Sequence, residues 1–286
     1  MKKLTTLFLA AMTSCSINAQ EITSQDYAKA FKNYNACFIL YSVNQHKIVS
    51  EYNPNNRCNQ RIAPDSTFSL SLIAFNEGII NQKSIFKWNG KKGIIAAHEQ
   101  DQTPATWLQY SVLWVSQELT PQLGYDKMKG YLASFKYGNQ DFSGDPGKKN
   151  GLQYAWLSSS LKISAIEQLN FLRAMLSKQL PIRSDAIAAT TENLYLGKLD
   201  KGADYYGKTG SGRHGPNERS LHPSQLRDGW FIGFINKDGE QYLFVSNLTD
   251  KKVQATIDSA DGSLKPYGSE LLKPITLALL NHYFYK

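Results

Sequence analysis

The chain has 286 residues, of which 42% are hydrophobic and 20% charged, so it can bury a sizeable core as one unit of two joined subdomains or as two small domains. Its net charge of +8 is a mild basic excess that suits attraction of small anionic molecules. Because the sequence has no dense run of lysine and arginine with interleaved aromatic residues, we do not expect nucleic acid as a partner.

The first 19 residues have the pattern of an export signal. Lys2 and Lys3 precede a short apolar run, which is followed by small residues that offer a cleavage site. We therefore expect an exported, periplasmic chain whose folded domain spans 20–286. Residues 12–15 loosely resemble a lipoprotein cleavage box, so a lipid anchor on Cys15 is an alternative. No later stretch is long and apolar enough to predict a transmembrane helix.

Two further cysteines form a candidate pair. Cys37 lies in an apolar run and Cys58 follows a polar turn, so the two could face each other near the base of a hairpin. In an exported protein such a pair is a disulfide candidate, and two buried thiols are the alternative. We expect no metal site, because the five histidines are scattered and no Cys-x-x-Cys pair occurs.

The first predicted elements are a short amphipathic helix over 21–33 and two strand-like segments, 36–42 and 47–52, which form a hairpin. A polar lead-in at Pro64 and Asp65 then opens a nearly continuous apolar run, which predicts a buried helix.

Ser66 falls in the first turn of that predicted helix. Backbone N–H groups are unpaired there, and the helix dipole favours developing negative charge. The position suits a serine nucleophile, and it equally suits a capping serine.

From there to about residue 200 the pattern is mostly helical. Helices are expected over 106–119 and 125–135, and a capping box from Ser164 to Glu167 opens another over 165–175. The polar stretch 137–161 is long for a loop, and loops of that length are uncommon unless they are functional. A surface connection pinned by its one tryptophan, Trp156, is the alternative.

After residue 200 the pattern returns to strands, over 204–209, 229–235 and 242–247, with a turn at 236–239. A closing helix is expected over 274–284, with Pro274 near its start.

Strand patterns at both ends of the chain, about 20–60 and 200–286, surround a helical part over about 61–199. The predicted fold is therefore α+β, with the helical part inserted into the sheet part.

Four features of the sequence occur together in serine acylases that handle β-lactams. They are a serine at a buried helix start, a second serine on another helix, a Tyr-x-Asn type segment, and Lys-Thr-Gly on a strand. Lys-Thr-Gly alone is a weak signal, since it arises by chance in roughly one chain in ten. All four in this order are far more specific, and here they are Ser66, Ser111, Tyr137-Gly138-Asn139 and Lys208-Thr209-Gly210.

From about Cys37 to its end the sequence closely resembles the class D, oxacillinase-type serine β-lactamases. The resemblance implies their penicillin-binding transpeptidase-like fold, an antiparallel sheet flanked by helices with an inserted all-helical subdomain. It is carried by Cys-Phe-Ile-Leu-Tyr at 37–41, Ala-Pro-Asp-Ser-Thr-Phe at 63–68, Trp-Val-Ser-Gln-Glu at 114–118, Tyr-Gly-Asn-Gln-Asp-Phe-Ser-Gly-Asp at 137–145, Ala-Trp at 155–156, Ser-Ser-Leu-Lys-Ile-Ser at 159–164, Tyr-Gly-Lys-Thr-Gly at 206–210 and Gly-Trp-Phe at 229–231.

The resemblance implies hydrolysis of β-lactam antibiotics, such as penicillins and oxacillin, by an acyl-enzyme on Ser66. The backbone N–H groups of Ser66 and Ser211 would form the oxyanion hole. Ser111 would pass a proton to the leaving nitrogen.

The Lys-Thr-Gly strand would bind the substrate. Lys208 and Thr209, followed by Gly210, would meet the substrate carboxylate. Trp156 would reach in from the long loop and donate a hydrogen bond to the general base.

One residue departs from the family motif Ser-x-x-Lys. The family lysine reacts with CO₂ to form a carbamate, which serves as the general base, but this chain has Ser69 at that position. A serine hydroxyl cannot replace it, because its pKa is far above the operating pH. We expect no cofactor here, and turnover that is weak or absent. The alternatives are a penicillin-binding protein that stays acylated and a catalytically inactive homologue.

Two smaller departures concern the surroundings of the site. Leu113 stands where the family commonly has valine, and we expect it to fill the space that the carbamate vacates, a neutral core swap being the alternative. The segment 211–228 is longer than expected. Its arginines, Arg213, Arg219 and Arg227, could meet a substrate carboxylate, or be solvated surface charges.

Overall fold

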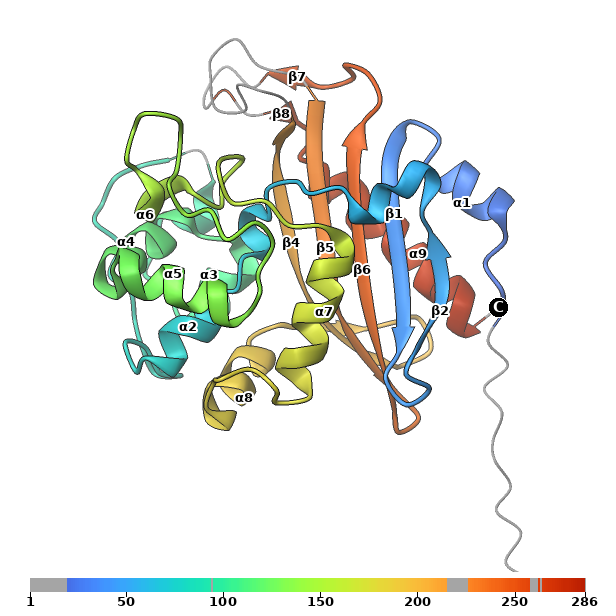
Figure 1. Cartoon of the computed structure of the whole chain (residues 1–286), viewed down its shortest axis with the longest axis horizontal. Helices are drawn as coiled ribbons and strands as arrows, with labels where there is room; N and C mark the ends of the chain where they lie inside the picture. The colour runs from blue at the N-terminus through green and yellow to red at the C-terminus, as the bar shows by residue number, and fades with distance from the viewer. Residues whose placement is uncertain (1–19, 94, 215–225, 258–261, 263, 286) are drawn as a thin grey trace, which may run out of the picture.

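The computed structural model describes residues 20–93, 95–214, 226–257, 262 and 264–285. A central sheet separates a helical part on one side from a pair of terminal helices on the other (Figure 1). The predicted export signal and Cys15 lie outside the described residues. Within the described part of the chain, no helix combines the length and the apolar character that crossing a membrane requires.

The sheet is antiparallel throughout and has the strand order β2-β1-β6-β5-β4-β3. The chain leaves the sheet after β2 and returns to it at β3, slightly before residue 200, where the sequence predicted the return. Strands from both ends of the sequence therefore lie side by side. The strands are β1 (Tyr34–Ser42), β2 (Lys47–Tyr52), β3 (Tyr195–Lys198), β4 (Asp204–His214), β5 (Leu226–Lys237) and β6 (Glu240–Asp250). A separate ribbon pairs β7 (Thr256–Ile257) with β8 (Leu264–Lys265).

Successive side chains of a strand point to opposite faces of the sheet. Both faces are apolar here, because even-numbered and odd-numbered residues alike are apolar along its strands. In β1, Cys37 and Ile39 point into one core, whereas Phe38 and Leu40 point into a second core. The second core lies under α1 (Ser24–Ala30) and α9 (Gly268–Tyr285).

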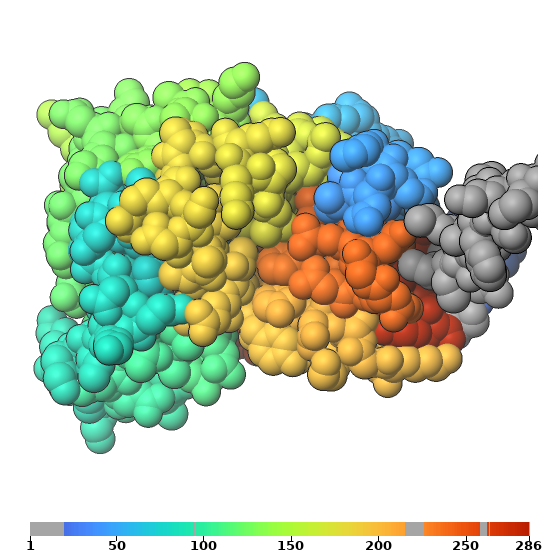
Figure 2. All heavy atoms as spheres, turned by 90° about the horizontal axis from the view of Figure 1, so that it is seen from below, coloured from blue at the N-terminus to red at the C-terminus, as the bar shows by residue number. Residues whose placement is uncertain are grey.

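The first core lies between the sheet and the helical part. Figure 2 shows the two parts from below, meeting along the yellow segment that holds α7 and α8. The helices of this part are α2 (Leu70–Asn76), α3 (Pro104–Tyr110), α4 (Leu113–Leu123), α5 (Tyr125–Ser134), α6 (Gly151–Tyr154), α7 (Ala165–Leu176) and α8 (Ser184–Glu192), and the 3₁₀ turns of the chain are η1 (Pro54–Asn59), η2 (Asp65–Thr67) and η3 (Ala96–His98).

Several local predictions are confirmed. The first two strands form the expected hairpin. At the start of α7, the Glu167 N–H donates to Ser164 Oγ at 3.2 Å and the Ser164 N–H donates to Glu167 Oε2 at 2.9 Å, which is the predicted capping box. Cys37 and Cys58 are joined in a disulfide, so the alternative of two free thiols does not hold.

The predicted start of the last helix is wrong. Pro274 lies inside α9, which begins at Gly268. The overlooked start signal is Glu270, whose carboxylate accepts a hydrogen bond from the Tyr267 N–H at 2.7 Å. Such a contact satisfies an N–H group that the helix leaves unpaired.

Candidate active site

Ser66 lies in the 3₁₀ turn η2, not in the first turn of a long α-helix as predicted. Phe68 has extended backbone angles (φ −62°, ψ 127°) and ends the turn, and α2 begins only at Leu70. Ser69 is the N-cap residue of α2. The helix is interrupted where the Phe68 ring packs against Tyr137 and Trp156, so tertiary packing overrides the local helix preference.

Hydrogen bonds from distant elements hold the segment around Ser66. The Trp230 ring N–H, on β5, donates to the Ala63 carbonyl at 2.8 Å. The Asp65 N–H donates to the Trp156 carbonyl at 2.9 Å. The Gln168 side chain, on α7, donates to Thr67 Oγ1 at 3.0 Å. The turn is therefore fixed from both the sheet and the helical part.

The second wall of the site is β4, which carries the Lys-Thr-Gly motif. Gly210 is required there, because an added Cβ would lie 2.9 Å from the Pro64 carbonyl oxygen and 3.3 Å from the Ser66 nitrogen. A real Cβ essentially never lies within 3.0 Å of a backbone atom, so the Pro64 carbonyl would have to shift. The glycine thus allows η2 to lie directly against the strand, and the structure brings Ser66 next to the motif.

Ser111 joins α3 to α4 in the left-handed conformation (φ 54°, ψ 47°), so the prediction that it sits on a helix is wrong. The expected helix over 106–119 is broken there into two. The Lys208 ammonium donates hydrogen bonds to Ser111 Oγ and, at 2.9 Å, to the Thr209 carbonyl. Ser111 therefore connects the helical part of the molecule to β4.

These groups surround one cavity with about 370 Å³ of empty space, part of it open to solvent. Ser69 does not line it, since the neighbouring positions Phe68 and Leu70 face the cavity instead. Ser66 and Ser69 form no side-chain hydrogen bond with another described residue. The cavity is lined by Asp65, Ser66, Phe68, Leu70, Trp107, Leu108, Ser111, Leu113, Ser116, Trp156, Leu157 and Lys208.

The electrostatics of the cavity are set by burial. Burial, reinforced by the positive charge of Lys273 on α9, lowers the pKa of Lys208 to about 7. Both hydrogen-bond acceptors of its amine are uncharged oxygens. An amine held this way can lose its proton near neutral pH.

Asp65 is a second ionisable group in the cavity, and the sequence interpretation used it only as a helix-start signal. It is 1% exposed and has positive φ (47°). Burial, and then the negative charge of Asp228, raise its pKa well above the usual range. Its Oδ1 accepts from the Ser158 N–H at 2.9 Å, and its Oδ2 has no hydrogen-bond partner among the described residues. Its position directly before Ser66 was the sequence signal that could have identified Asp65 as a residue of the site.

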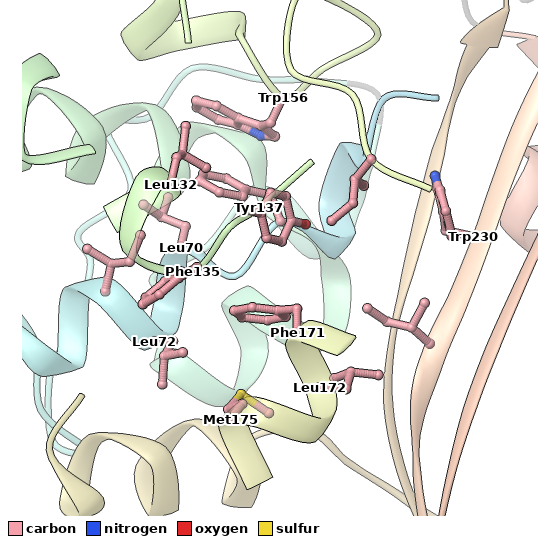
Figure 3. Close-up of a cluster of buried hydrophobic side chains, with 14 of the residues drawn as sticks. Leu70, Leu72, Leu132, Phe135, Tyr137, Trp156, Phe171, Leu172, Met175 and Trp230 are labelled. Atoms are coloured by element: carbon pink, nitrogen blue, oxygen red, sulfur yellow. The ribbon is translucent and has the colours of Figure 1, made fainter. Parts of the chain in front are cut away.

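Trp156 lines the cavity. It belongs to the buried hydrophobic cluster of Figure 3, where it lies near Tyr137 and Leu132. It is 3% exposed, and its ring stacks on Phe142 with a 6.1 Å centroid distance. Its ring N–H forms no hydrogen bond to another described residue, so its expected bond to a general base stays a prediction. Leu113 lines the cavity and is 37% exposed, and its expected filling of the space that the carbamate vacates stays a prediction.

Tyr137, Asn139 and Ser211 are not among the residues that line the cavity. Tyr137 is buried, and its hydroxyl accepts a hydrogen bond from Gln168 at 3.2 Å. Asn139 binds the backbone of Ser160 and Lys162, so this segment holds the long loop in place. The Ser211 hydroxyl donates to Ser269 on α9 at 2.8 Å.

The arginines of the 211–228 segment have different environments. Arg227 is 3% exposed and its guanidinium forms an ion pair with Asp250 at 2.8 Å, so it is not available to a substrate. The backbone N–H of Arg213 donates to Ser158 Oγ at 2.9 Å. Arg219 lies outside the described residues.

Other places in the described structure offer less chemistry. A larger hollow, of about 1060 Å³, lies between α8 and the β3–β4 edge, and no serine, cysteine or lysine lines it. Among the described residues there is no cluster of three or more histidine, cysteine or acidic side chains that could hold a metal ion.

The chain is similar to known proteins over most of its length. Residues 24–275 match the family described as the penicillin-binding protein transpeptidase domain. The chain is 44% identical over 246 residues to β-lactamase OXA-1 of Escherichia coli, a match that covers 85% of this chain and 86% of that protein.

The fold is also similar to those of solved structures. A class D β-lactamase from Bacillus subtilis superimposes with a TM-score of 0.73 at 28% identity, covering 91% of this chain and 96% of that one. The C-terminal domain of the Bacillus licheniformis BlaR penicillin-receptor superimposes with a TM-score of 0.73 at 27% identity, covering 90% and 94%.

Proposed function

The chain belongs to the class D β-lactamases, within the penicillin-binding transpeptidase family, and from this premise we propose that a β-lactam acylates Ser66 and that the acyl-enzyme is hydrolysed only slowly. The observation that carries the proposal is the composition of the cavity. Ser66, Ser111 and Lys208 line the cavity. Ser69, which stands at the position of the family's lysine, does not line it.

Acylation needs a nucleophile and donors for the developing oxyanion. Ser66 Oγ attacks the lactam carbonyl, and the backbone N–H groups of Ser66 and Ser211 receive the oxyanion. The close approach of η2 to β4 at Gly210 supports this assignment. Each such donor is worth about 10²–10³ in rate.

Hydrolysis of the acyl-enzyme needs a base that removes a proton from water. Ser69 cannot carry the carbamate, and its hydroxyl is too weak a base. Loss of such a group costs about 10²–10⁴ per step. The acyl-enzyme therefore accumulates.

Penicillin recognition without hydrolysis is a second candidate function, favoured by the similarity to the penicillin-receptor domain. It predicts the same stable adduct on Ser66 with no release at all. An inactive homologue is the third candidate, and it predicts no adduct.

The test is to incubate the protein with a chromogenic cephalosporin while following both colour and intact protein mass. We expect a burst of about one equivalent of colour and a persistent mass increase, because acylation outpaces deacylation. Ser66→Ala, which removes only the hydroxyl, is the control and should remain unlabelled. Many rapid turnovers without a persistent adduct would contradict slow deacylation, and no adduct would favour the inactive homologue.

Location is a separate proposal. We propose that residues 1–19 direct export to the periplasm, which the family's substrates and the disulfide between Cys37 and Cys58 support. Mass analysis of the protein purified from cells would distinguish a chain starting near residue 20 from one lipidated at Cys15.

A further inference from the structure

We propose that Lys208, acting through the hydroxyl of Ser111, is the proton acceptor for the acylation of Ser66 in this chain. The inference rests on the proposed acylation. It names a base for that step in a chain that has no lysine at position 69. It assigns Lys208 a proton-transfer role in addition to binding the substrate carboxylate.

The geometry supports this route. Ser66, Ser111 and Lys208 come from η2, the α3–α4 junction and β4, and they line the same cavity. Lys208 Nζ is hydrogen-bonded to Ser111 Oγ, so a proton on that hydroxyl has a direct path to the amine. Ser66 Oγ forms no hydrogen bond with another described residue, which leaves it free to bond to Ser111 once substrate fills the cavity. Catalytic hydrogen bonds often tighten only in the substrate complex.

The charges around the amine favour its neutral form. Lys273, from α9, is a cation whose field opposes protonation of Lys208. Asp65, from η2, lines the same cavity, and burial raises its pKa, which disfavours the carboxylate. With a pKa of about 7, half of the Lys208 side chains carry a free lone pair at neutral pH.

Asp65 is the competing acceptor, and its surroundings argue against it. Its Oδ1 accepts two hydrogen bonds from Ser158, at 2.9 and 3.2 Å. Its Oδ2 faces β4, where a Cβ added to Gly212 would lie 2.2 Å away. The carboxyl group is thus turned to Ser158 and the strand, whereas Lys208 contacts the serine that bridges the site.

The proton balance closes without any other reactant. As Ser66 Oγ forms its bond to the lactam carbonyl carbon, its proton moves to Ser111 Oγ and the Ser111 proton moves to Lys208 Nζ. When the lactam C–N bond breaks, the nitrogen takes its proton from Ser111, which is reprotonated by Lys208. Lys208 ends the step neutral, as it began.

The experiment measures the acylation rate constant and the binding constant separately, by stopped flow with the chromogenic cephalosporin between about pH 5.5 and 9. For the unmodified protein we expect the rate constant to rise about tenfold per pH unit and to level off above about pH 7. Lys208→Arg keeps a positive charge for the substrate carboxylate but cannot lose its proton. It should lower the rate constant about 10²–10⁴-fold, leave binding within about threefold, and abolish the pH dependence.

Two further variants make the test decisive. Ser111→Ala breaks the route at its middle and should give the same loss and the same flat pH profile. The side chain of Asp65→Asn can still accept hydrogen bonds from Ser158, and the acylation rate constant of this variant should still rise with pH. Thermal unfolding of each variant checks that the fold is kept.

The possible failures are distinguishable. Lys208→Arg acylated at the unmodified rate, or an Asp65→Asn profile that becomes flat, would overturn the inference while leaving acylation of Ser66 intact. Absence of labelling at every pH in the unmodified protein would overturn the proposed function and the inference with it.

Discussion

The two walls of the cavity are built differently. The β4 wall lies in an uninterrupted antiparallel ladder, paired with β5 residue by residue from Asp204 to His214. The opposite wall is a 3₁₀ turn, a break at Phe68 and a separate short helix. On the β4 wall the backbone ladder fixes the position of Lys208. On the helical wall our proposal concerns a single side chain, at position 69.

This difference bears on the proposal that the site lacks its general base. Replacing one side chain leaves a ladder of backbone hydrogen bonds intact, so the motif Lys208-Thr209-Gly210 keeps its place. In our proposal Ser69 leaves the opposite wall without a base, and Phe68 beside it has extended backbone outside any helix. The proposed loss of the base therefore concerns a wall that depends on one side chain, whereas the backbone ladder holds the opposite wall in place.

Ser69→Lys is the change with the largest expected effect. An amine at this position, once carbamylated, can activate the deacylating water, so we expect steady-state hydrolysis to rise about 10²–10⁴-fold. Ser69→Met, of similar length without the amine, is the matched control and should give no gain. An unchanged rate in Ser69→Lys would show that the break at Phe68 disables this wall independently of the missing amine.

Gly210→Ala tests how closely the two walls must approach. The added Cβ would meet the Pro64 carbonyl at 2.9 Å and push η2 away from the strand. We expect acylation of Ser66 to fall about 10²–10³-fold, the effect of losing an oxyanion donor. Gly130→Ala, at a helical position with nothing within 4 Å, is the control and should leave acylation unchanged. Normal acylation in Gly210→Ala would mean that the oxyanion donors lie elsewhere.

The disulfide between Cys37 and Cys58 ties β1 to the segment that leads into η2. Replacing both cysteines by alanine should lower the free energy of unfolding by about 3 kcal/mol, measured by urea denaturation. Neither residue lines the cavity, so acylation of the folded protein should stay within about threefold. A parallel loss of acylation would show that this tether positions the helical wall.

Local signals in the sequence were sufficient for much of the fold. The capping box at Ser164 and the turn between β5 and β6 depend on neighbours within a few residues, and both predictions hold. The helix over Ser66 and the helix around Ser111 failed, because the packing of Phe68 and the left-handed backbone of Ser111 are set by distant parts of the chain. The short strand β3 was missed altogether.

The candidate site shows the same division. Motif spacing and the family resemblance selected Ser66, Ser111 and Lys208, which the structure brings to one cavity. The lowered pKa of Lys208 was beyond the reach of sequence, since it depends on burial and on Lys273, which lies 65 positions later in the sequence. The oxyanion and substrate roles of Ser211 and Thr209 stay predictions.

The pairing of β1 with β6 has a consequence for the order in which the protein acquires its structure. Phe38 lies opposite Ser246, so an early strand completes its hydrogen bonds only with one of the last to be synthesised. A nascent chain cannot close this sheet before most of its length has left the ribosome, and such distant pairings slow folding. The topology therefore delays closure of this sheet until late in synthesis, which is compatible with the proposed export.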